Sequence, residues 1–383
     1  MKRNYIAKRF QNAGSGLTLD TEALAKYKDI IDLSIGDTDF ITDEGIINAA
    51  FRDAKAGYTR YGDPKGDPEL IDAVCRAWQE DFEQKLPHDH VLVSASSCLG
   101  MALVMFSILD PGDEVIVFSP YFPMYRTQIE LAGGVCVDVP TYASENYAID
   151  EARLRAAITP RTKAIIFNNP TNPTGMAYGN DTLEMLARVA KEYDLLIAAD
   201  EIYTTYLYVG DFRPLRTLPG MAERTITLNS FSKNFLMTGW RVGVIIAEPE
   251  LLEVMNDING SLIYTAPSIS QRAAIHALSM RREIREKYVT AYRDRIFYTA
   301  DRIEKIPYLS LVWPKGTFYL FPGIEKTGLT DDEFCNVLLD KAHVLVSHGK
   351  AFGTAGAGHF RIACTVGIDT LKIAFDRMEK LSL

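Results

Sequence analysis

Two cations interrupt a stretch that otherwise has the character of a turn followed by a buried strand. Lys233 lies in SFSKNFLMTGWRVG (residues 230–243), and Arg241 precedes the apolar run VGVIIA. Most lysines lie on the surface, so Lys233 alone could be a loop residue, but an amine here would also suit Schiff-base chemistry. Arg241 could pair with an acid at a strand end, or it could bind a phosphate or carboxylate through both ends of its guanidinium. Ser230 could fill a turn position or donate its hydroxyl to the same anion.

Two further segments carry polar side chains at or just after the end of an apolar run. Asp200 ends the run LLIAAD, where burial of a carboxylate costs free energy unless a cation lies near. It could form a structural ion pair, or it could hold the protonated ring nitrogen of a cofactor. Tyr203 could donate to the same ligand or pack as an ordinary aromatic residue. Asn172 lies in the turn-rich segment NNPTNPTG (residues 168–175), which predicts a rigid loop and could present its amide to a ligand oxygen.

A third segment, SASSCLGMALVMF (residues 94–106), places small polar residues directly before a helical pattern. A serine here could simply cap that helix. The free backbone N–H groups at a helix start also attract anions. The sequence therefore leaves two interpretations of Ser96, Ser97 and Cys98 open, helix capping and a phosphate site.

The residues that could do chemistry are separated by a regular alternation of apolar and amphipathic segments. Apolar runs lie at residues 90–95, 114–120, 135–140, 162–170, 195–200, 224–232 and 240–248, and helical patterns lie at 99–109, 121–134, 150–159 and 181–194. Short apolar strands that alternate with helices are typical of an α/β protein with a mostly parallel central sheet, covered on both faces. Ligands bind at the carboxyl ends of such strands. Ser96, Asn168, Asp200 and Ser230 all fall at these ends, so we expect them to lie close together.

A second, smaller α/β unit is predicted from the C-terminal part of the chain. Residues 267–305 have a helical pattern throughout, which predicts either one long bent helix or two helices in sequence. After it, the patterns follow the order strand, helix, strand, strand, helix. We therefore expect an N-terminal segment (1–45) that packs on the small domain, a large ligand-binding domain (46–285) and a small C-terminal domain (286–383).

Composition restricts the partners and the compartment. The 383 residues include 41 basic and 50 acidic side chains, a net charge of −9, which argues against nucleic acid and anionic membrane surfaces as partners. The five cysteines are odd in number and form no CxxC pair, as expected for reduced thiols in the cytoplasm. The basic N-terminus lacks the apolar core of a secretory signal, and no apolar run reaches the roughly 18 residues that a membrane span requires.

Other enzyme classes lack their signatures in this chain. GTAGAG (residues 353–358) has neither the glycine order nor the setting of a dinucleotide-binding fingerprint. The six histidines form no HExxH motif, so we predict no metal site. There is also no GxSxG nucleophile elbow.

Three segments together resemble one enzyme family. NNPTNPTG, DEIY (residues 200–203) and SFSKNFLMTGWRVG occur in this order, and they are similar to motifs of the class I/II aminotransferases, the aspartate aminotransferase-like branch of the fold-type I enzymes that depend on pyridoxal 5'-phosphate (PLP). The similarity extends from IDLSIGDTDF to FRIACTVG. It implies a role in amino acid metabolism, with transfer of an amino group from an L-amino acid to a 2-oxo acid. A PLP-dependent lyase, decarboxylase or oxidase stays open as the alternative, because fold does not determine reaction.

The resemblance also implies roles for single residues. Lys233 would form the internal aldimine with PLP, Asp200 would pair with the ring nitrogen, and Asn172 and Tyr203 would hydrogen-bond the ring hydroxyl oxygen. The phosphate would be held by Ser96, Ser97, Cys98, Ser230 and Arg241, and Phe122 would stack on the ring. Arg361, in HFRIAC, would hold the substrate α-carboxylate, and Gly36, in LSIGD, would line the substrate pocket. Tyr61 would reach the phosphate of a neighbouring subunit, which implies a homodimer with composite active sites.

The chain departs from the common family pattern in three segments near the expected pocket, and one of them, ACTVG (residues 363–367), ends the Arg361 strand unusually. SASSCLGM has Cys98 and Leu99 where relatives often carry a small or polar residue and glutamine, and VSHGKAFG has His348 and Lys350 within a run that is frequently Pro-Gly-Ser. We expect these changes to affect the choice of substrate and not the binding of the cofactor.

Overall fold

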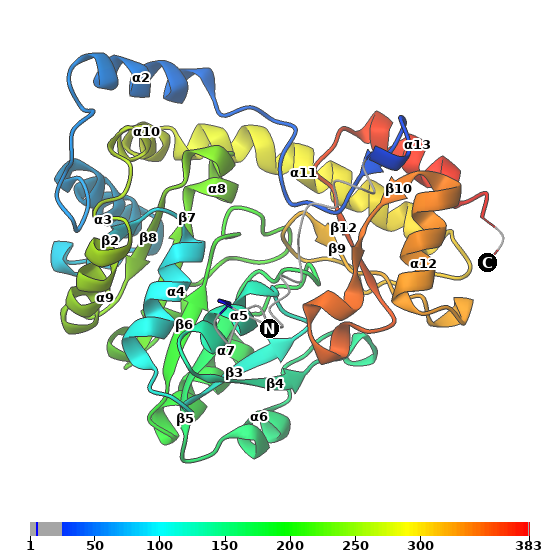
Figure 1. The fold of residues 1–383 in the computed structure, drawn as a ribbon, viewed down its shortest axis with the longest axis horizontal. Coiled ribbons are helices and arrows are strands. Elements are labelled where there is room, and N and C mark those ends of the chain that lie inside the picture. The colour runs from blue at the N-terminus through cyan, green and yellow to red at the C-terminus, as the bar shows by residue number, and fades with distance from the viewer. Residues whose placement is uncertain (1–4, 7–24, 382) are drawn as a thin grey trace.

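A seven-stranded sheet forms the centre of the larger part of the molecule (Figure 1). The computed structural model describes residues 5–6, 25–381 and 383. In order across the sheet the strands are β2 (Val91–Ser94), β8 (Gly243–Ile246), β7 (Thr225–Ser230), β6 (Leu196–Asp200), β5 (Thr162–Asn168), β3 (Glu114–Ser119) and β4 (Val135–Pro140). Only β8 runs antiparallel to its neighbours. The predicted mostly parallel α/β sheet is therefore confirmed.

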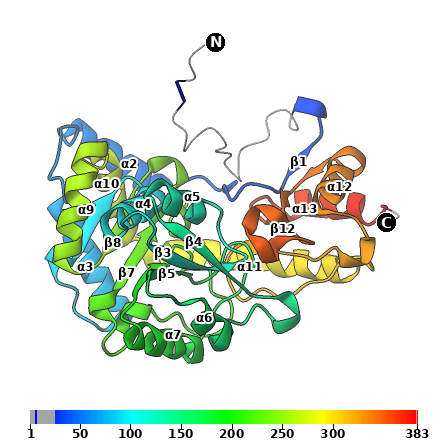
Figure 2. The same cartoon turned by 60° about the horizontal axis from the view of Figure 1, so that its bottom comes forward.

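Helices cover both faces of this sheet, as Figure 2 shows. One face packs against α4 (Ser97–Ile108), α5 (Met124–Leu131) and α9 (Pro249–Leu262). The other packs against α6 (Glu151–Ala157) and α7 (Asn180–Glu192). Alternate strand residues are apolar on both sides, with Val115 and Val117 facing the first layer and Ile116 facing the second. This explains why the strands appear in the sequence as continuous apolar runs.

The long helical pattern at residues 267–305 forms two helices. They are α10 (Ser268–Ser279) and α11 (Arg281–Glu304), and Met280 lies between them. Helix α10 packs against α2 (Glu44–Lys55) and α3 (Pro68–Phe82). Helix α11 leads from the large sheet to the C-terminal part of the chain (Figure 1), so the second of the two predicted arrangements is the correct one.

The C-terminal part contains two small sheets and two helices. Strands β11 (Ser347–His348), β12 (Phe360–Ala363) and β9 (Tyr319–Leu320) pair antiparallel, and β1 (Ile31–Asp32) pairs in parallel with β10 (Val344–Leu345). Helices α12 (Asp331–Val337) and α13 (Ile368–Met378) complete this part. A segment from near the N-terminus is therefore hydrogen-bonded to the C-terminal part.

The exact division into three parts stays a prediction. Its limit at residue 285/286 falls within α11, and residues 1–4 and 7–24 of the predicted N-terminal segment lie outside the described residues. Within the described part of the chain, no helix is long and apolar enough to cross a membrane. No group of three His, Cys, Asp or Glu side chains there could hold a metal ion.

Candidate active site

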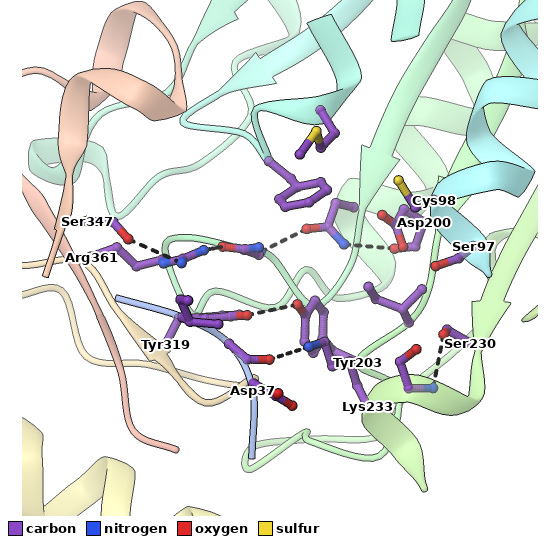
Figure 3. Close-up of a pocket in the computed structure, with 18 of the residues that line it drawn as sticks. Asp37, Ser97, Cys98, Asp200, Tyr203, Ser230, Lys233, Tyr319, Ser347 and Arg361 are labelled. Atoms are coloured by element: carbon purple, nitrogen blue, oxygen red, sulfur yellow. Dashed lines mark hydrogen bonds between the residues drawn. The ribbon is translucent and has the colours of Figure 1, made fainter. Parts of the chain in front are cut away.

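A cavity of about 840 Å³ lies between the carboxyl ends of the central strands and the C-terminal part of the chain. Eleven of the thirteen predicted site residues line it: Gly36, Ser97, Cys98, Phe122, Asn172, Asp200, Tyr203, Ser230, Lys233, Arg241 and Arg361. Figure 3 shows Ser347 and Arg361 entering from the C-terminal part, opposite Ser97, Cys98 and Asp200. Ser96 and Tyr61 do not line the cavity.

Lys233 is positioned by a short helix that directly follows a strand of the central sheet. Strand β7 ends at Ser230, whose side chain accepts a hydrogen bond from the backbone N–H of Ser232 at 3.1 Å and so caps α8 (Phe231–Asn234). Lys233 lies in this helix, and its Nζ donates a hydrogen bond to the carbonyl oxygen of Gly36. A Cβ atom at Gly36 would lie 1.8 Å from the hydroxyl oxygen of Tyr319. Glycine is therefore needed for this close approach.

The carboxylate of Asp200 is buried and has few hydrogen-bond donors. Asp200 ends β6, is 7% exposed, and accepts a hydrogen bond through Oδ2 from the hydroxyl of Tyr125. Its Oδ1 is also buried, but it has no hydrogen-bond partner among the described residues. Burial raises the pKa of Asp200 to about 6, although the hydrogen bond from Tyr125 and the nearby backbone N–H of Ile202 act in the opposite direction. A donor or cation is expected at such an oxygen.

The N-terminus of α4 and Arg241 lie on the same cavity wall. The side chain of Ser96 accepts a hydrogen bond from the backbone N–H of Leu99 at 3.1 Å, so Ser96 takes the capping role that the sequence left open. Ser97 and Cys98 occupy the first turn and line the cavity, where backbone N–H groups favour an anion. Arg241 has a φ of 55°, an unusual value for a residue other than glycine. It donates to the carbonyl of Thr238 at 2.6 Å.

The guanidinium of Arg361 lies at the end of the cavity opposite Asp200 (Figure 3). Arg361 lies in β12, is 3% exposed, and donates to Asn172 Oδ1 at 3.0 Å, to the carbonyl of Ser34 at 2.5 Å and to Ser347 Oγ at 3.3 Å. All three partners are neutral. Its guanidinium also lies over the ring of Tyr319, 4.5 Å from the centroid. Burial lowers the pKa of Arg361, as expected for a charge without a counterion.

Two of the three aromatic residues predicted for the site, Tyr203 and Phe122, line the cavity. The hydroxyl of Tyr203 donates to that of Tyr319 at 3.3 Å, and burial, together with the neighbouring hydroxyl of Tyr319, raises the pKa of Tyr203 well above its usual value. Phe122 packs edge to face with Tyr125, with 5.7 Å between ring centroids.

Tyr61 lies on the surface, away from the cavity. Its side chain is 82% exposed and touches Tyr264, which is 53% exposed, with 5.0 Å between ring centroids. Large exposed aromatic residues that lie together are typical of an interaction surface.

Several lining residues were not identified from the sequence, namely Tyr125, Gln128, Tyr319 and Ser347. Tyr125 and Gln128 follow Phe122 at intervals of three residues, so a helix starting at this segment would have placed all three on one face. Tyr319 and Ser347 carried no comparable signal, because their contacts with Tyr203 and Arg361 join segments far apart in the sequence.

Of the four substituted residues named above in SASSCLGM and VSHGKAFG, two line the cavity and two do not. Cys98 and His348 line the cavity. His348 also pairs through Nδ1 with Asp332 at 2.8 Å. Lys350 pairs with the same carboxylate, and neither Lys350 nor Leu99 lines the cavity.

The cavity occupies the place where α/β sheets bind ligands, and comparisons with known proteins define the family. The model of the family "Aminotransferase class I and II" matches residues 28–378. An aspartate aminotransferase from Pyrococcus abyssi is 37% identical, over 93% of this chain and 92% of its own. The arginine–pyruvate transaminase AruH of Pseudomonas aeruginosa is 34% identical, over 93% and 91%. A mutant aspartate aminotransferase of Thermus thermophilus superposes with a TM-score of 0.93 at 32% identity, over 99% and 100% of the two chains.

The chain therefore belongs to the class I and II aminotransferases, a family of PLP-dependent enzymes. The predicted family, fold type and aminotransferase activity are confirmed.

Proposed function

We propose that this aminotransferase binds PLP through Lys233 and uses it to transfer the amino group of an L-amino acid to a 2-oxo acid. The observation that carries the proposal is the convergence of an amine, a buried carboxylate and a buried guanidinium on one cavity. The residues present also fit the cofactor. Asp200 has a buried oxygen without a partner, which suits the protonated ring nitrogen of PLP.

The remaining cofactor contacts are distributed over the cavity walls. Asn172 and Tyr203 would hold the ring hydroxyl oxygen, and Phe122 would stack on the ring. The phosphate would be held by Ser97, Cys98, Ser230 and Arg241, through the free N–H groups of α4 and the guanidinium. Ser96 would support this site indirectly, by capping the helix. When bound, PLP supplies an electron sink that makes the proton on the substrate Cα removable.

The protein's own side chains would orient the substrate and move its proton. Arg361 would bind the α-carboxylate through two parallel hydrogen bonds, which fixes the direction of the Cα–H bond. Lys233, freed from the cofactor, would take that proton as a general base. Asp200 would keep the ring nitrogen protonated, because a nearby negative charge favours the cationic form.

We expect neutral amino acids to be accepted alongside acidic ones. Among the described residues that line the cavity, the lysine and arginine side chains are Lys233, Arg241 and Arg361, and each already has a role. His348 is the further side chain there that could carry positive charge. Relatives of similar identity are named for aspartate and for arginine, so similarity alone does not fix the substrate side chain.

The proposal includes a cytoplasmic homodimer. Tyr61 would reach the phosphate bound in the partner subunit, which would give its exposed ring a function. The exposed rings of Tyr61 and Tyr264 support a subunit interface at this surface.

A half-reaction screen tests the function. PLP-loaded enzyme is mixed with each L-amino acid in turn, and the cofactor spectrum is followed together with released ammonia, carbon dioxide and peroxide. Conversion of the cofactor to its aminated form without any of these products supports transamination, whereas stoichiometric release of one of them supports a lyase, decarboxylase or oxidase. Lys233→Ala should abolish the spectral change. Lys287→Ala, at a surface lysine that pairs with Asp43 at 3.7 Å, is the matched control.

A further inference from the structure

Residues 57–67, which we call the Tyr61 segment, lie between α2 and α3 and expose the side chain of Tyr61. The backbone of this segment is nevertheless attached to α10. The hydroxyl of Ser268, the first residue of α10, donates to the carbonyl of Arg60 at 2.6 Å. This hydrogen bond fixes the backbone directly before Tyr61, so the exposed ring projects from an anchored position.

Arg272, also in α10, joins the Tyr61 segment to the helices on both sides of it. Its side chain is 8% exposed, and its Nε donates to Asp53 Oδ2 in α2 at 2.7 Å. Its Nη1 lies 3.2 Å from Asp67 Oδ2, at the end of the segment, and 3.0 Å from Glu69 Oε2 in α3. The guanidinium also lies over the ring of Tyr58, 4.1 Å from the centroid. One buried arginine thus contacts both ends of the segment where α2, α3 and α10 lie together (Figure 1).

Gln271 connects the Tyr61 segment to the loop that precedes α10. Its Oε1 accepts from the backbone N–H of Asp67 at 2.6 Å, and its Nε2 donates to the carbonyl of Ala266 at 3.0 Å. Ala266 lies two residues after Tyr264, whose exposed ring packs edge to face with Tyr61. Exposed loop tips are usually poorly ordered, and fixing a backbone costs conformational entropy. A pair of exposed rings on an anchored backbone is therefore expected where the rings have a function.

Arg272 and Asp53 are both charged at neutral pH. Burial acts to raise the pKa of Asp53, but hydrogen bonds from Arg272 and His276 outweigh it, so the pKa is lowered. Burial also acts to lower the pKa of Arg272, but its carboxylate partners raise it above its usual value. Hydrogen bonds between charged groups are the stronger ones, and the planar guanidinium fixes the directions of several at once. Arg272 can therefore hold α2, α3 and the Tyr61 segment in one arrangement.

We propose that Arg272 is a positioning residue that holds the Tyr61 segment in the conformation in which Tyr61 reaches the phosphate bound by the partner subunit. This inference rests on the proposed PLP function and on its composite site. Arg272 lies outside the three family motifs and does not line the cavity. It belongs to the subunit that supplies Tyr61, so its loss should weaken the cofactor site of the partner and not the site of its own subunit.

The first test compares Arg272→Gln with Arg302→Gln. Arg302 is a matched control, because its side chain is 11% exposed and pairs with Asp376 and Glu379 at 2.7 Å each, in the C-terminal part of the chain. Each apoenzyme is titrated with PLP at one protein concentration, and binding is followed by fluorescence. We expect the Kd for PLP to rise about tenfold in Arg272→Gln, as for loss of one hydrogen bond to a charged group, and to change less than about twofold in Arg302→Gln.

Two milder variants keep the test valid if Arg272→Gln does not fold. Arg272→Lys retains the charge but lacks the planar fork, and Tyr58→Leu removes only the ring contact with Arg272. Both should raise the Kd about threefold or more. In the Tyr61→Phe background, the substitution at Arg272 should have little further effect, because coupled residues are non-additive. Additive losses, or a wild-type Kd in all of the variants at Arg272 and Tyr58, would overturn the inference.

Hybrid dimers separate positioning from general damage. Arg272→Gln chains are allowed to exchange subunits with an excess of Lys233→Ala chains. In each hybrid, Lys233 lies in the Arg272→Gln subunit, whereas Tyr61 reaches that site from a chain with intact Arg272. At equal free PLP, the borohydride-fixed adduct at Lys233 should therefore return to within about twofold of its wild-type PLP dependence. A hybrid that stays as weak as the Arg272→Gln homodimer would show that Arg272 acts within its own subunit, against the proposal.

Failure of the inference can be distinguished from failure of the proposed function. If wild-type protein does not bind PLP, or if Lys233→Ala retains the bound-cofactor spectrum, the proposed function itself is wrong. If Tyr61→Phe binds PLP as the wild type does, the composite site is wrong and the role of Arg272 is wrong with it. If Tyr61→Phe loses affinity but Arg272→Gln behaves like Arg302→Gln, only the role of Arg272 is wrong.

Discussion

Replacement of Asp200 by asparagine should change stability and cofactor binding in opposite directions. Asp200 is 7% exposed and has one hydrogen-bonded carboxylate oxygen and one without a partner. Without a cofactor, its negative charge is buried beside neutral partners, which is unfavourable. Asparagine has nearly the same size and no charge. We therefore expect the Asp200→Asn apoenzyme to be more stable than the wild type near neutral pH, and to bind PLP far more weakly.

The size of the expected difference in the free energy of unfolding follows from the raised pKa of Asp200. Burial raises the pKa of Asp200 from 3.8 to about 6, and about two pKa units correspond to about 3 kcal/mol. The pKa of Asp200 is higher in the folded state than in the unfolded state, so protonation of Asp200 favours folding. This contribution of about 3 kcal/mol to the free energy of unfolding is fully present below the unfolded pKa of 3.8 and is lost as the pH rises through about 6. About 2 kcal/mol of the loss falls between about pH 4.5 and pH 7.5. Asparagine does not titrate, so the variant avoids this loss.

The assay is urea unfolding of both apoenzymes at the two pH values and at one protein concentration. We expect the variant's advantage in free energy of unfolding to grow by about 2 kcal/mol from the lower to the higher pH. Glu201 is present in both proteins, so the rise in its pKa to about 8 that burial causes is common to both. Its weaker repulsion with Asp200 is absent from the variant, which adds to the variant's advantage at the higher pH. An advantage that does not change with pH would show that Asp200 is solvated or paired in the apoenzyme, and would refute the account of its burial.

The other residues of the site give further expectations. Lys233→Ala should abolish the cofactor adduct that borohydride reduces in the wild type, as mass spectrometry can verify. Arg361→Lys should raise KM for amino acids about tenfold or more, because lysine cannot form paired hydrogen bonds with a carboxylate, and steady-state kinetics with a matched amine substrate controls for other damage. Gly36→Ala should destabilise the enzyme by about 1–3 kcal/mol, because its Cβ would lie 1.8 Å from the hydroxyl of Tyr319; an unchanged thermal midpoint would contradict this. Tyr61→Phe should weaken PLP binding in the dimer, whereas a fully active monomer in sedimentation would exclude a composite site.

Much of the site could be predicted from the sequence because parallel strands end at one edge of a sheet. Asn168, Asp200 and Ser230 each lie at or near the end of an apolar run, and the structure places them at the ends of β5, β6 and β7. Local pattern was sufficient here, since neighbouring strands bring their carboxyl ends together whatever their exact register. The resemblance to the family added Arg361 and Gly36, which no periodicity could have connected to the other residues.

The rest depended on contacts that local pattern does not encode. Ser96 and Ser97 are adjacent and chemically identical, yet one caps α4 and the other lines the cavity. Tyr125 reaches a carboxylate 75 residues away. The outcome in both cases depends on how α4 and α5 pack on the sheet, a long-range property. The role proposed for Tyr61 depends on a second copy of the chain.

The two ends of the cavity carry opposite charges that the protein itself leaves unbalanced. Asp200 ends one apolar strand, Arg361 lies within another, and both have neutral hydrogen-bond partners. Buried charges without counterions destabilise the fold, so residues of this kind are expected where they bind a ligand or serve a function. Glu201 gives the same sequence signal as its neighbour and is also buried, but its carboxylate accepts from the backbone of Leu215 at 3.0 Å and does not line the cavity. A charge in an apolar run therefore indicates the region of the site. A buried atom without a partner among the described residues, Asp200 Oδ1 or Arg361 Nε, indicates which charge is available to the ligand.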